Sequence, residues 1–189
     1  MTIFRITLLV SALALLAGAA PLESQDLSLR VAAGAAIPVG GAGERRDAGP
    51  AAMLSVESRL SRLWSLRLDG EWSRLKGSPA PAGQEHFSEY LDLRTVGLSL
   101  NGSLRLSEGE FAPYLLAGLG AYRLQRVGGP PNPYGTTGAV QVGLGMNANL
   151  WERVNPFVEA RALVHVTDYG SDEWSPTVTW PVLLGVRIR

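Results

Sequence analysis

The chain has 189 residues with 17 basic and 17 acidic side chains, so its formal net charge is zero and its charge gives no sign of a nucleic-acid partner. It has no cysteine, which excludes disulfides and the lipid-bearing cysteine of a bacterial lipoprotein. With 22 glycines, 12 prolines and 7% aromatic residues, the composition favours many short strands and turns in a single domain.

The first twenty residues have the pattern of a secretory signal peptide. Arg5 precedes an apolar run over 6–17, and small residues follow in Ala17-Gly18-Ala19. We therefore expect a signal peptide over 1–19 and a mature domain over 20–189, with an uncleaved anchor as the alternative. No later apolar stretch reaches about 18 residues, the length that a transmembrane helix needs, so a membrane-spanning chain would cross as strands.

Alternation with a period of two predicts strands in the first half of the chain. The predicted strands are 27–37, 52–60, 64–76 and 90–106, with long polar connections at 38–50 and 77–88 and a short turn at 61–63. The apolar spacing in 52–60 also fits a helix. In 90–106 the apolar residues change phase, which predicts a bulge near Arg94 and Thr95. Asn101-Gly102 is a hairpin signal, but turning there would leave a strand too short to cross a bilayer, so we expect a turn at 107–110.

The second half of the chain continues the pattern. The predicted strands are 113–126, 139–150, 158–166 and 177–189, with long connections at 127–138 and 168–175 and a short one at 151–155. In 158–166 an apolar face opposes the charged Glu159 and Arg161, whereas both faces of 113–126 are apolar and its outer face is left open. Eight strands predict an all-β fold, an eight-stranded antiparallel up-and-down β-barrel that follows the signal peptide.

Three features favour a transmembrane barrel over a soluble, lipocalin-like barrel with an apolar interior. Long and short connections alternate, as they do in outer-membrane barrels. Aromatic residues gather near strand ends, which predicts two aromatic girdles. The predicted girdle residues are Trp64, Trp72, Tyr90, Tyr114, Tyr122, Trp151, Phe157 and Trp180.

The third feature is the charge on the other face of the strands, five cations against four anions. Since a central Arg or Lys on a lipid-facing wall costs about 2–4 kcal/mol, these residues are expected inside, where opposite signs can pair. The predicted interior charge network is Arg30, Glu57, Arg59, Arg67, Asp69, Glu71, Glu159, Arg161 and Arg187.

Two segments carry a family resemblance. They are Pro113-Tyr114-Leu115-Leu116-Ala117-Gly118-Leu119-Gly120, which leads to Tyr122, and the closing run from Pro181 to Arg189. On these the chain resembles the outer membrane β-barrel domain family, the small OmpA/OmpX-like barrels. The resemblance implies a Gram-negative outer membrane, contact with its lipids, and recognition of the last strand by the barrel assembly machinery. Gly185 and Ile188 fit that signal, while Arg189 stands where the family usually has Phe.

Eight strands enclose an interior that side chains can fill, so a packed ionic core and no general porin activity are expected. We predict a non-enzymatic, structural envelope protein whose long connections form an interaction surface.

A small ion-conducting pore is one alternative. A lipid A-modifying enzyme is a second alternative, because His165-Val166-Thr167, followed by Glu173, weakly resembles the His-x-Ser pair and Glu of lipid A deacylases. However, Thr replaces Ser, and His165 shares the inward parity of Arg161. No cofactor or metal is expected, and His86 beside Glu85 lacks metal-ligand spacing.

Overall fold

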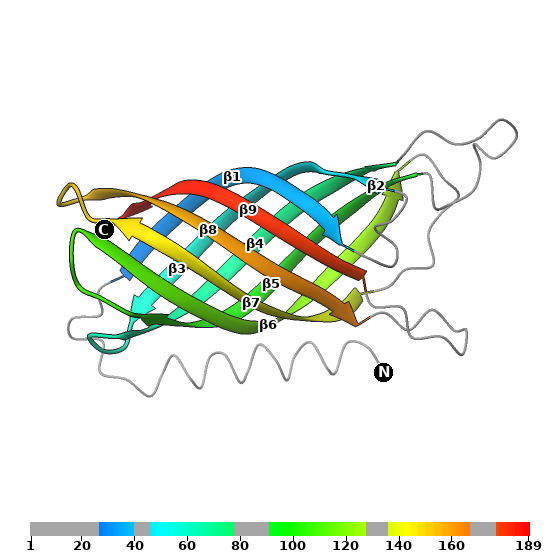
Figure 1. The fold of residues 1–189 in the computed structure, drawn as a ribbon. Coiled ribbons are helices and arrows are strands. Elements are labelled where there is room, and N and C mark those ends of the chain that lie inside the picture. The colour runs from blue at the N-terminus through cyan, green and yellow to red at the C-terminus, as the bar shows by residue number, and fades with distance from the viewer. Residues whose placement is uncertain (1–26, 40–45, 78–90, 128–135, 167–176) are drawn as a thin grey trace, which may run out of the picture.

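The computed structural model describes residues 27–39, 46–77, 91–127, 136–166 and 177–189 (Figure 1). The regular structure of these residues is β-strand: β1 (Leu27–Val39), β2 (Arg46–Asp47), β3 (Gly49–Arg59), β4 (Trp64–Gly77), β5 (Asp92–Arg105), β6 (Phe111–Val127), β7 (Thr136–Ala148), β8 (Val154–Val166) and β9 (Thr177–Ile188). Within the described residues, no helix has the length and apolar character needed to span a bilayer. The predicted signal peptide over 1–19 lies outside the described residues.

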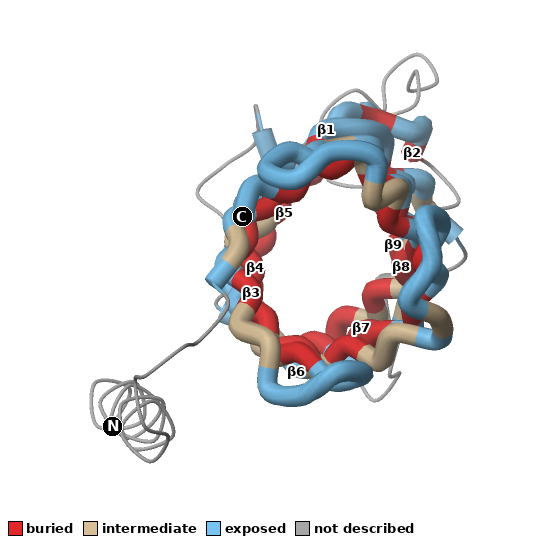
Figure 2. Tube along the Cα trace, turned by 90° about the vertical axis from the view of Figure 1, so that its left-hand side faces the viewer, coloured by how far each residue is buried: buried red, intermediate tan, exposed pale blue. Residues whose placement is uncertain are grey.

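Eight of these strands form a closed ring. Neighbours pair antiparallel in the order β4, β3, β1, β9, β8, β7, β6, β5, and the pairing of β5 with β4 closes the barrel. The view down the axis in Figure 2 shows the ring. The two-residue strand β2 pairs with the end of β4. Because strands that follow one another in the chain are neighbours in the ring, the prediction of an eight-stranded up-and-down barrel is confirmed.

The connections differ in length at the two ends of the barrel. At one end, the short-turn end, only residues 60–63, 106–110 and 149–153 join consecutive strands. At the other, the long-connection end, strands are joined through 78–91, 128–135 and 167–176, and through a first segment that contains β2. The predicted alternation of long and short connections is confirmed by these strand bounds.

The predicted bulge in 90–106 is wrong. Strand β5 pairs with β4 without a slip from Leu104 opposite Trp64 to Leu93 opposite Leu75, and it pairs as regularly with β6. Leu93 points into the barrel and is buried. The apolar residues change phase because the inner wall itself becomes apolar near the long-connection end. The helical alternative for 52–60 is also excluded, since these residues lie in β3 up to Arg59.

The two faces of the wall are inverted relative to a soluble protein. On the outer face Leu119, Leu144 and Leu184 are 67%, 63% and 68% exposed, whereas on the inner face Glu159 and Arg161 are 1% and 2% exposed. A soluble barrel would place its leucines in the dry centre and its charges in water. The arrangement is therefore that of a transmembrane barrel, with an apolar wall for lipid and charged groups inside.

Strand β6 leaves no ambiguity about its faces in the structure. Leu115 and Leu119 point outward, while Tyr114 and Tyr122 point into the lumen. Each tyrosine lies against a glycine across the ladder, Tyr114 opposite Gly145 and Tyr122 opposite Gly97. A Cβ atom on Gly145 would come within 2.4 Å of the Tyr114 ring, so the inward glycines make room for the large side chains that fill the barrel.

Candidate functional site

Polar side chains and one methionine, from seven strands, meet inside the barrel, and we call this set the lumen network. Its members are Arg30, Met53, Glu57, Arg67, Asp69, Glu71, Ser99, Asn101, Tyr114, Gln141, Asn147, Glu159 and Arg161. Alternation places them all on the inner face, because successive residues of a strand point to opposite sides. The glycines of the inner wall leave the space that three arginines and two tyrosines need.

Arg161 on β8 is the centre of this network. Its guanidinium contacts Glu159 at 2.5 Å, Glu71 at 2.6 Å and Asp69 at 2.8 Å, and none of these side chains is more than 11% exposed. One cation thus faces three carboxylates. A buried charge is tolerated only when it is paired and hydrogen-bonded, which this geometry provides for Arg161.

A second arginine reduces the excess of carboxylates around Arg161. Arg67 on β4 contacts Glu159 at 2.7 Å and Asp69 at 3.2 Å, so both acids bridge the two arginines. The Asn101 amide also donates to Asp69 at 2.9 Å. Each of these carboxylates therefore has more than one donor, which the five N–H groups of a guanidinium make possible.

The third arginine extends the network toward the short-turn end. Arg30 on β1 binds Glu57 at 2.8 Å, Tyr114 at 2.7 Å and the Asn147 side chain at 3.1 Å. Its guanidinium also lies 4.0 Å from the centre of the Phe157 ring, a cation–π contact. Tyr114 in turn donates to Glu159 and so joins the Arg30 group to the groups around Arg67 and Arg161.

Uncharged polar side chains complete the network on the β5 and β7 side. The Gln141 amide donates to Ser99 at 2.6 Å and to the Asn101 oxygen at 2.7 Å, and Ser99 donates to Glu71 at 2.9 Å. Sequence reasoning missed these residues because it considered only charged side chains. Their parity was a usable signal, since Gln141 alternates with the outward Val140 and Val142.

The structure brings together seven of the nine predicted interior charges in this network. Arg187 also lies inside the barrel, where it donates to Asn149 at 2.8 Å, and Arg59 is half-buried near the end of β3. The other seven are Arg30, Glu57, Arg67, Asp69, Glu71, Glu159 and Arg161.

Above the network, toward the long-connection end, most of the inner wall is apolar, although Thr95, His165 and Thr179 are buried there too. Its buried apolar side chains there are Ala36, Ala51, Leu75, Leu93, Leu124, Ala139, Leu163 and Leu183. Between the two zones, a cavity of about 20 Å³ beside Glu71, Thr95 and Tyr122 has room for about one water molecule. The described side chains of the lumen therefore form an ionic zone and a mostly apolar zone in series.

The aromatic residues follow the girdle prediction only where their parity is outward. Trp64 and Trp151 are exposed at the short-turn end, and Trp180 is exposed toward the long-connection end. Trp72 lies on the outer face of β4 and is half-buried. Phe111, exposed at the short-turn end, was missed because it lies outside the strand predicted over 113–126, whereas β6 begins at Phe111.

The girdle prediction is wrong for three residues. Tyr114, Tyr122 and Phe157 are 3%, 1% and 2% exposed and point into the lumen. Their rings fill space beside inward glycines and arginines, so they are part of the core of the barrel. Tyr90 lies outside the described residues.

The faint resemblance to a lipid A deacylase has little support in the geometry. His165 is buried in the lumen, where its ring lies edge-on to Tyr122 at 5.1 Å. An apolar wall separates it from any outer lipid, as its inward parity predicted. Thr167 and Glu173 lie outside the described residues, as do His86 and Glu85. Among the described residues, no group of His, Asp or Glu side chains has a metal-binding arrangement.

The chain resembles known proteins in its structure, whereas the comparisons of its sequence found no match. No protein-family model matches the sequence, and no curated protein matches it. Among solved structures, neisserial surface protein A (NspA) is 18% identical over 88% of this chain and 99% of its own, with a TM-score of 0.65. Ail, the attachment invasion locus protein of Yersinia pestis, in complex with the heparin analogue sucrose octasulfate, is 15% identical over 87% and 99%, with a TM-score of 0.52. OprG of Pseudomonas aeruginosa is 12% identical over 87% and 96%, with a TM-score of 0.52. By its closed ring of eight strands and by these similarities, the chain has the fold of the small, OmpA/OmpX-like outer-membrane barrels.

Proposed function

We propose that this protein is a non-enzymatic β-barrel of the Gram-negative outer membrane, in which the sheet is structural and the long connections form the interaction surface. The inverted wall carries the proposal. Side chains such as Leu144 need a lipid environment, and the charges around Arg161 are already paired within the barrel. Outer-membrane barrels meet both needs with one closed sheet.

The filled lumen supports a role without ion flux. An ion would have to displace the bonds of Arg161 and then cross the apolar zone around Leu163 and Leu183. We therefore expect the protein to be silent in planar lipid bilayers. Insertion is checked on the same sample by urea-resistant, heat-modifiable migration in gel electrophoresis, which reports a folded barrel. Steady unitary currents from an inserted barrel would establish the pore alternative instead.

The interaction surface is supported by the barrel's asymmetry and by one structural relative. The four long connections, over 40–48, 78–91, 128–135 and 167–176, all join strands at a single end of the barrel. Ail, with the same fold, is an attachment protein and is seen bound to a heparin analogue. Cells that display the protein should adhere to a heparin-coated surface more than cells without it, and replacement of 78–90 and 128–135 by short Gly-Ser turns should abolish the difference. Unchanged adhesion by correctly folded loop variants would remove this part of the proposal.

A further inference from the structure

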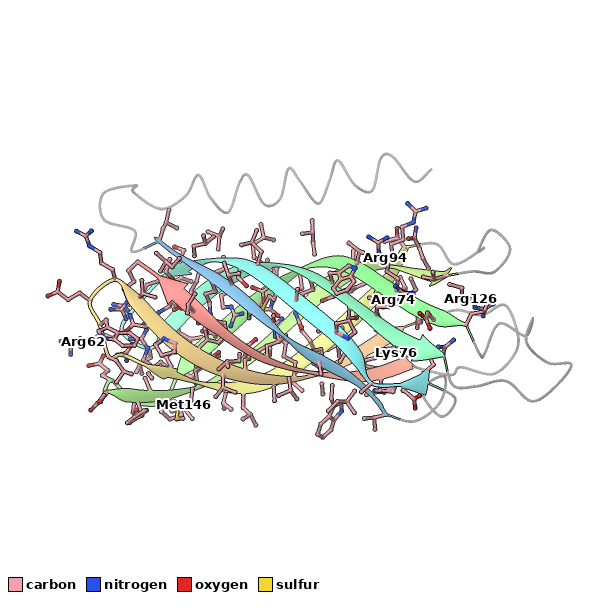
Figure 3. The ribbon with its side chains drawn as sticks, turned by 90° about the horizontal axis from the view of Figure 1, so that it is seen from above. Arg62, Arg74, Lys76, Arg94, Arg126 and Met146 are labelled. Carbon is pink, nitrogen blue, oxygen red and sulfur yellow. The ribbon has the colours of Figure 1, made fainter. Side chains whose placement is uncertain are left out.

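Cations collect on one sector of the outer wall at the long-connection end. Along β4 the outward residues change from the apolar Leu68, Gly70 and Trp72 to Arg74 and Lys76. The neighbouring strands β5 and β6 carry outward cations at the same end. We call Arg74, Lys76, Arg94 and Arg123, all of which are exposed, the basic patch. In Figure 3, Arg74, Lys76 and Arg94 lie at one end of the barrel and Arg62 at the other.

Strand register brings the cations of the basic patch close together. Arg74 is directly opposite Arg94, and Arg123 is the diagonal neighbour of Arg94 because it pairs with Val96. Like charges directly opposite on one face of a sheet destabilise it. This placement is therefore unfavourable for the sheet alone, and an anion bound on the outer wall would reduce the repulsion between the cations.

The described residues supply only part of that negative charge. Asp92 binds the Arg74 guanidinium at 2.7 Å, and Asp47 is the backbone partner of Lys76. No carboxylate among the described residues forms an ion pair with Arg94 or Arg123. The basic patch thus keeps a net positive charge on β5 and β6.

The basic patch is specific to one sector and one end of the barrel. At the same end, β1 and β9 present the apolar Ile37, Val39 and Trp180 to the outside. At the short-turn end the exposed charges are of both signs. They are Arg62, Glu108, Glu110, Glu152, Arg153 and Arg189. A general requirement for positive charge around the rim does not explain this distribution.

We propose that the basic patch binds the phosphate groups of a membrane lipid headgroup, whose acyl chains lie on the apolar wall directly below it. This rests on the proposed membrane location. Guanidinium groups bind phosphate oxygens in a bidentate manner and retain their charge at any physiological pH. Two further facts favour a lipid over a soluble anion. The cations face outward from the wall, and the wall beneath them is continuous with the exposed Leu98 and Leu119.

Gly70 adds a place for an acyl chain. It is the outward residue between Leu54 and Leu98 on the neighbouring strands, and a Cβ added there would meet no atom closer than 3.7 Å. Because Gly70 has no side chain, the outer wall has a shallow depression between Leu54 and Leu98, on the same strand as Arg74. A lipid with its phosphate bound to the basic patch could place one acyl chain in this depression.

Lipid retention tests the proposal. The refolded full chain is exchanged into detergent micelles that contain diphosphorylated lipid A, and bound lipid is counted by native mass spectrometry. We expect one lipid to be retained. The combined Arg74→Gln, Arg94→Gln and Arg123→Gln variant should bind it about tenfold or more weakly, since several charge-assisted hydrogen bonds are lost. The matched control, Arg62→Gln with Arg153→Gln at the opposite end, should retain lipid as the unmodified protein does.

Several results would overturn the proposal. They are equal retention by the patch variant, equal retention of dephosphorylated lipid A, and patch-dependent binding of inorganic phosphate or of a sulfated oligosaccharide without retention of lipid. Heat-modifiable migration is recorded for every variant. A folded barrel that retains no lipid refutes the basic patch alone, whereas a chain that forms no barrel in lipid refutes the proposed function.

Discussion

Replacement of Arg161 by alanine is expected to lower the free energy of unfolding by about 3–5 kcal/mol, the usual effect of removing one partner from a buried ion network. Arg161 faces Asp69, Glu71 and Glu159, and only Arg67 would remain to balance these three carboxylates. The uncompensated charges would lie in a barrel with an apolar zone on one side. Urea-induced unfolding in lipid vesicles, followed by tryptophan fluorescence, measures the effect.

Two comparisons make this result specific to the lumen network. Arg161→Lys keeps the charge but loses the forked donors, so its stability should fall between those of the unmodified protein and the alanine variant. Arg74→Ala removes the exposed ion pair with Asp92, which is expected to contribute about 0–1 kcal/mol. If Arg161→Ala is no more destabilising than Arg74→Ala, the network does not hold the barrel together.

Replacement of Leu68 by arginine should destabilise the barrel in lipid by about 2–4 kcal/mol. Leu68 is on the outer face of β4, midway between Trp64 and Trp72, where the wall meets the middle of the bilayer. An arginine there must draw water or headgroups into the hydrocarbon region. The measurement is again urea unfolding in lipid vesicles.

The control for this variant uses the same substitution at a different depth. Leu104 is the cross-strand partner of Trp64 on the outer face, so Leu104→Arg lies near the membrane interface and should cost about 0–1 kcal/mol. A soluble barrel would tolerate both substitutions equally, because both side chains would be in water. Equal stabilities for the two variants would therefore contradict a lipid-facing wall.

Much of the fold follows from the alternation of side chains along each strand. Val142 and Leu144 against Gln141, or Val158 against Glu159, define one apolar and one polar face without any tertiary information. The connections then give the ring order, because consecutive antiparallel strands joined by short turns are neighbours. These local signals are enough to predict the number of strands, the closure of the barrel and which face of each strand points inward.

The mistaken predictions share one physical cause, which is that the lumen is not uniformly polar. Tyr114, Tyr122 and Phe157 were assigned to the girdles from their position near strand ends, although Phe157 has the parity of Glu159. Leu93 suggested a bulge because an apolar residue was expected to face lipid. Tyrosine and leucine are as suitable for a packed lumen as for the outer wall, so residue type alone cannot assign them to one side.

The partners within the lumen network could not be predicted from the sequence. Which carboxylate Arg161 binds depends on the register and curvature of strands that are far apart in the chain, and on glycines that let side chains cross the barrel. Arg161 reaches Glu71 on β4, and Arg30 on β1 reaches Asn147 on β7. A sequence pattern gives the face of each residue but not the length or direction of these contacts.

The span of the Arg30 contacts has a consequence for how the protein folds. Arg30 and Asn147 are 117 positions apart in the chain, and their bond passes through the space that the sheet encloses. Such a bond can form only when the first and last strands have met, so partly assembled sheets would carry arginines and acids that still need water. We therefore expect closure of the barrel and entry of its charges into the bilayer to occur together, and to be slow because many of its contacts join residues far apart in the chain.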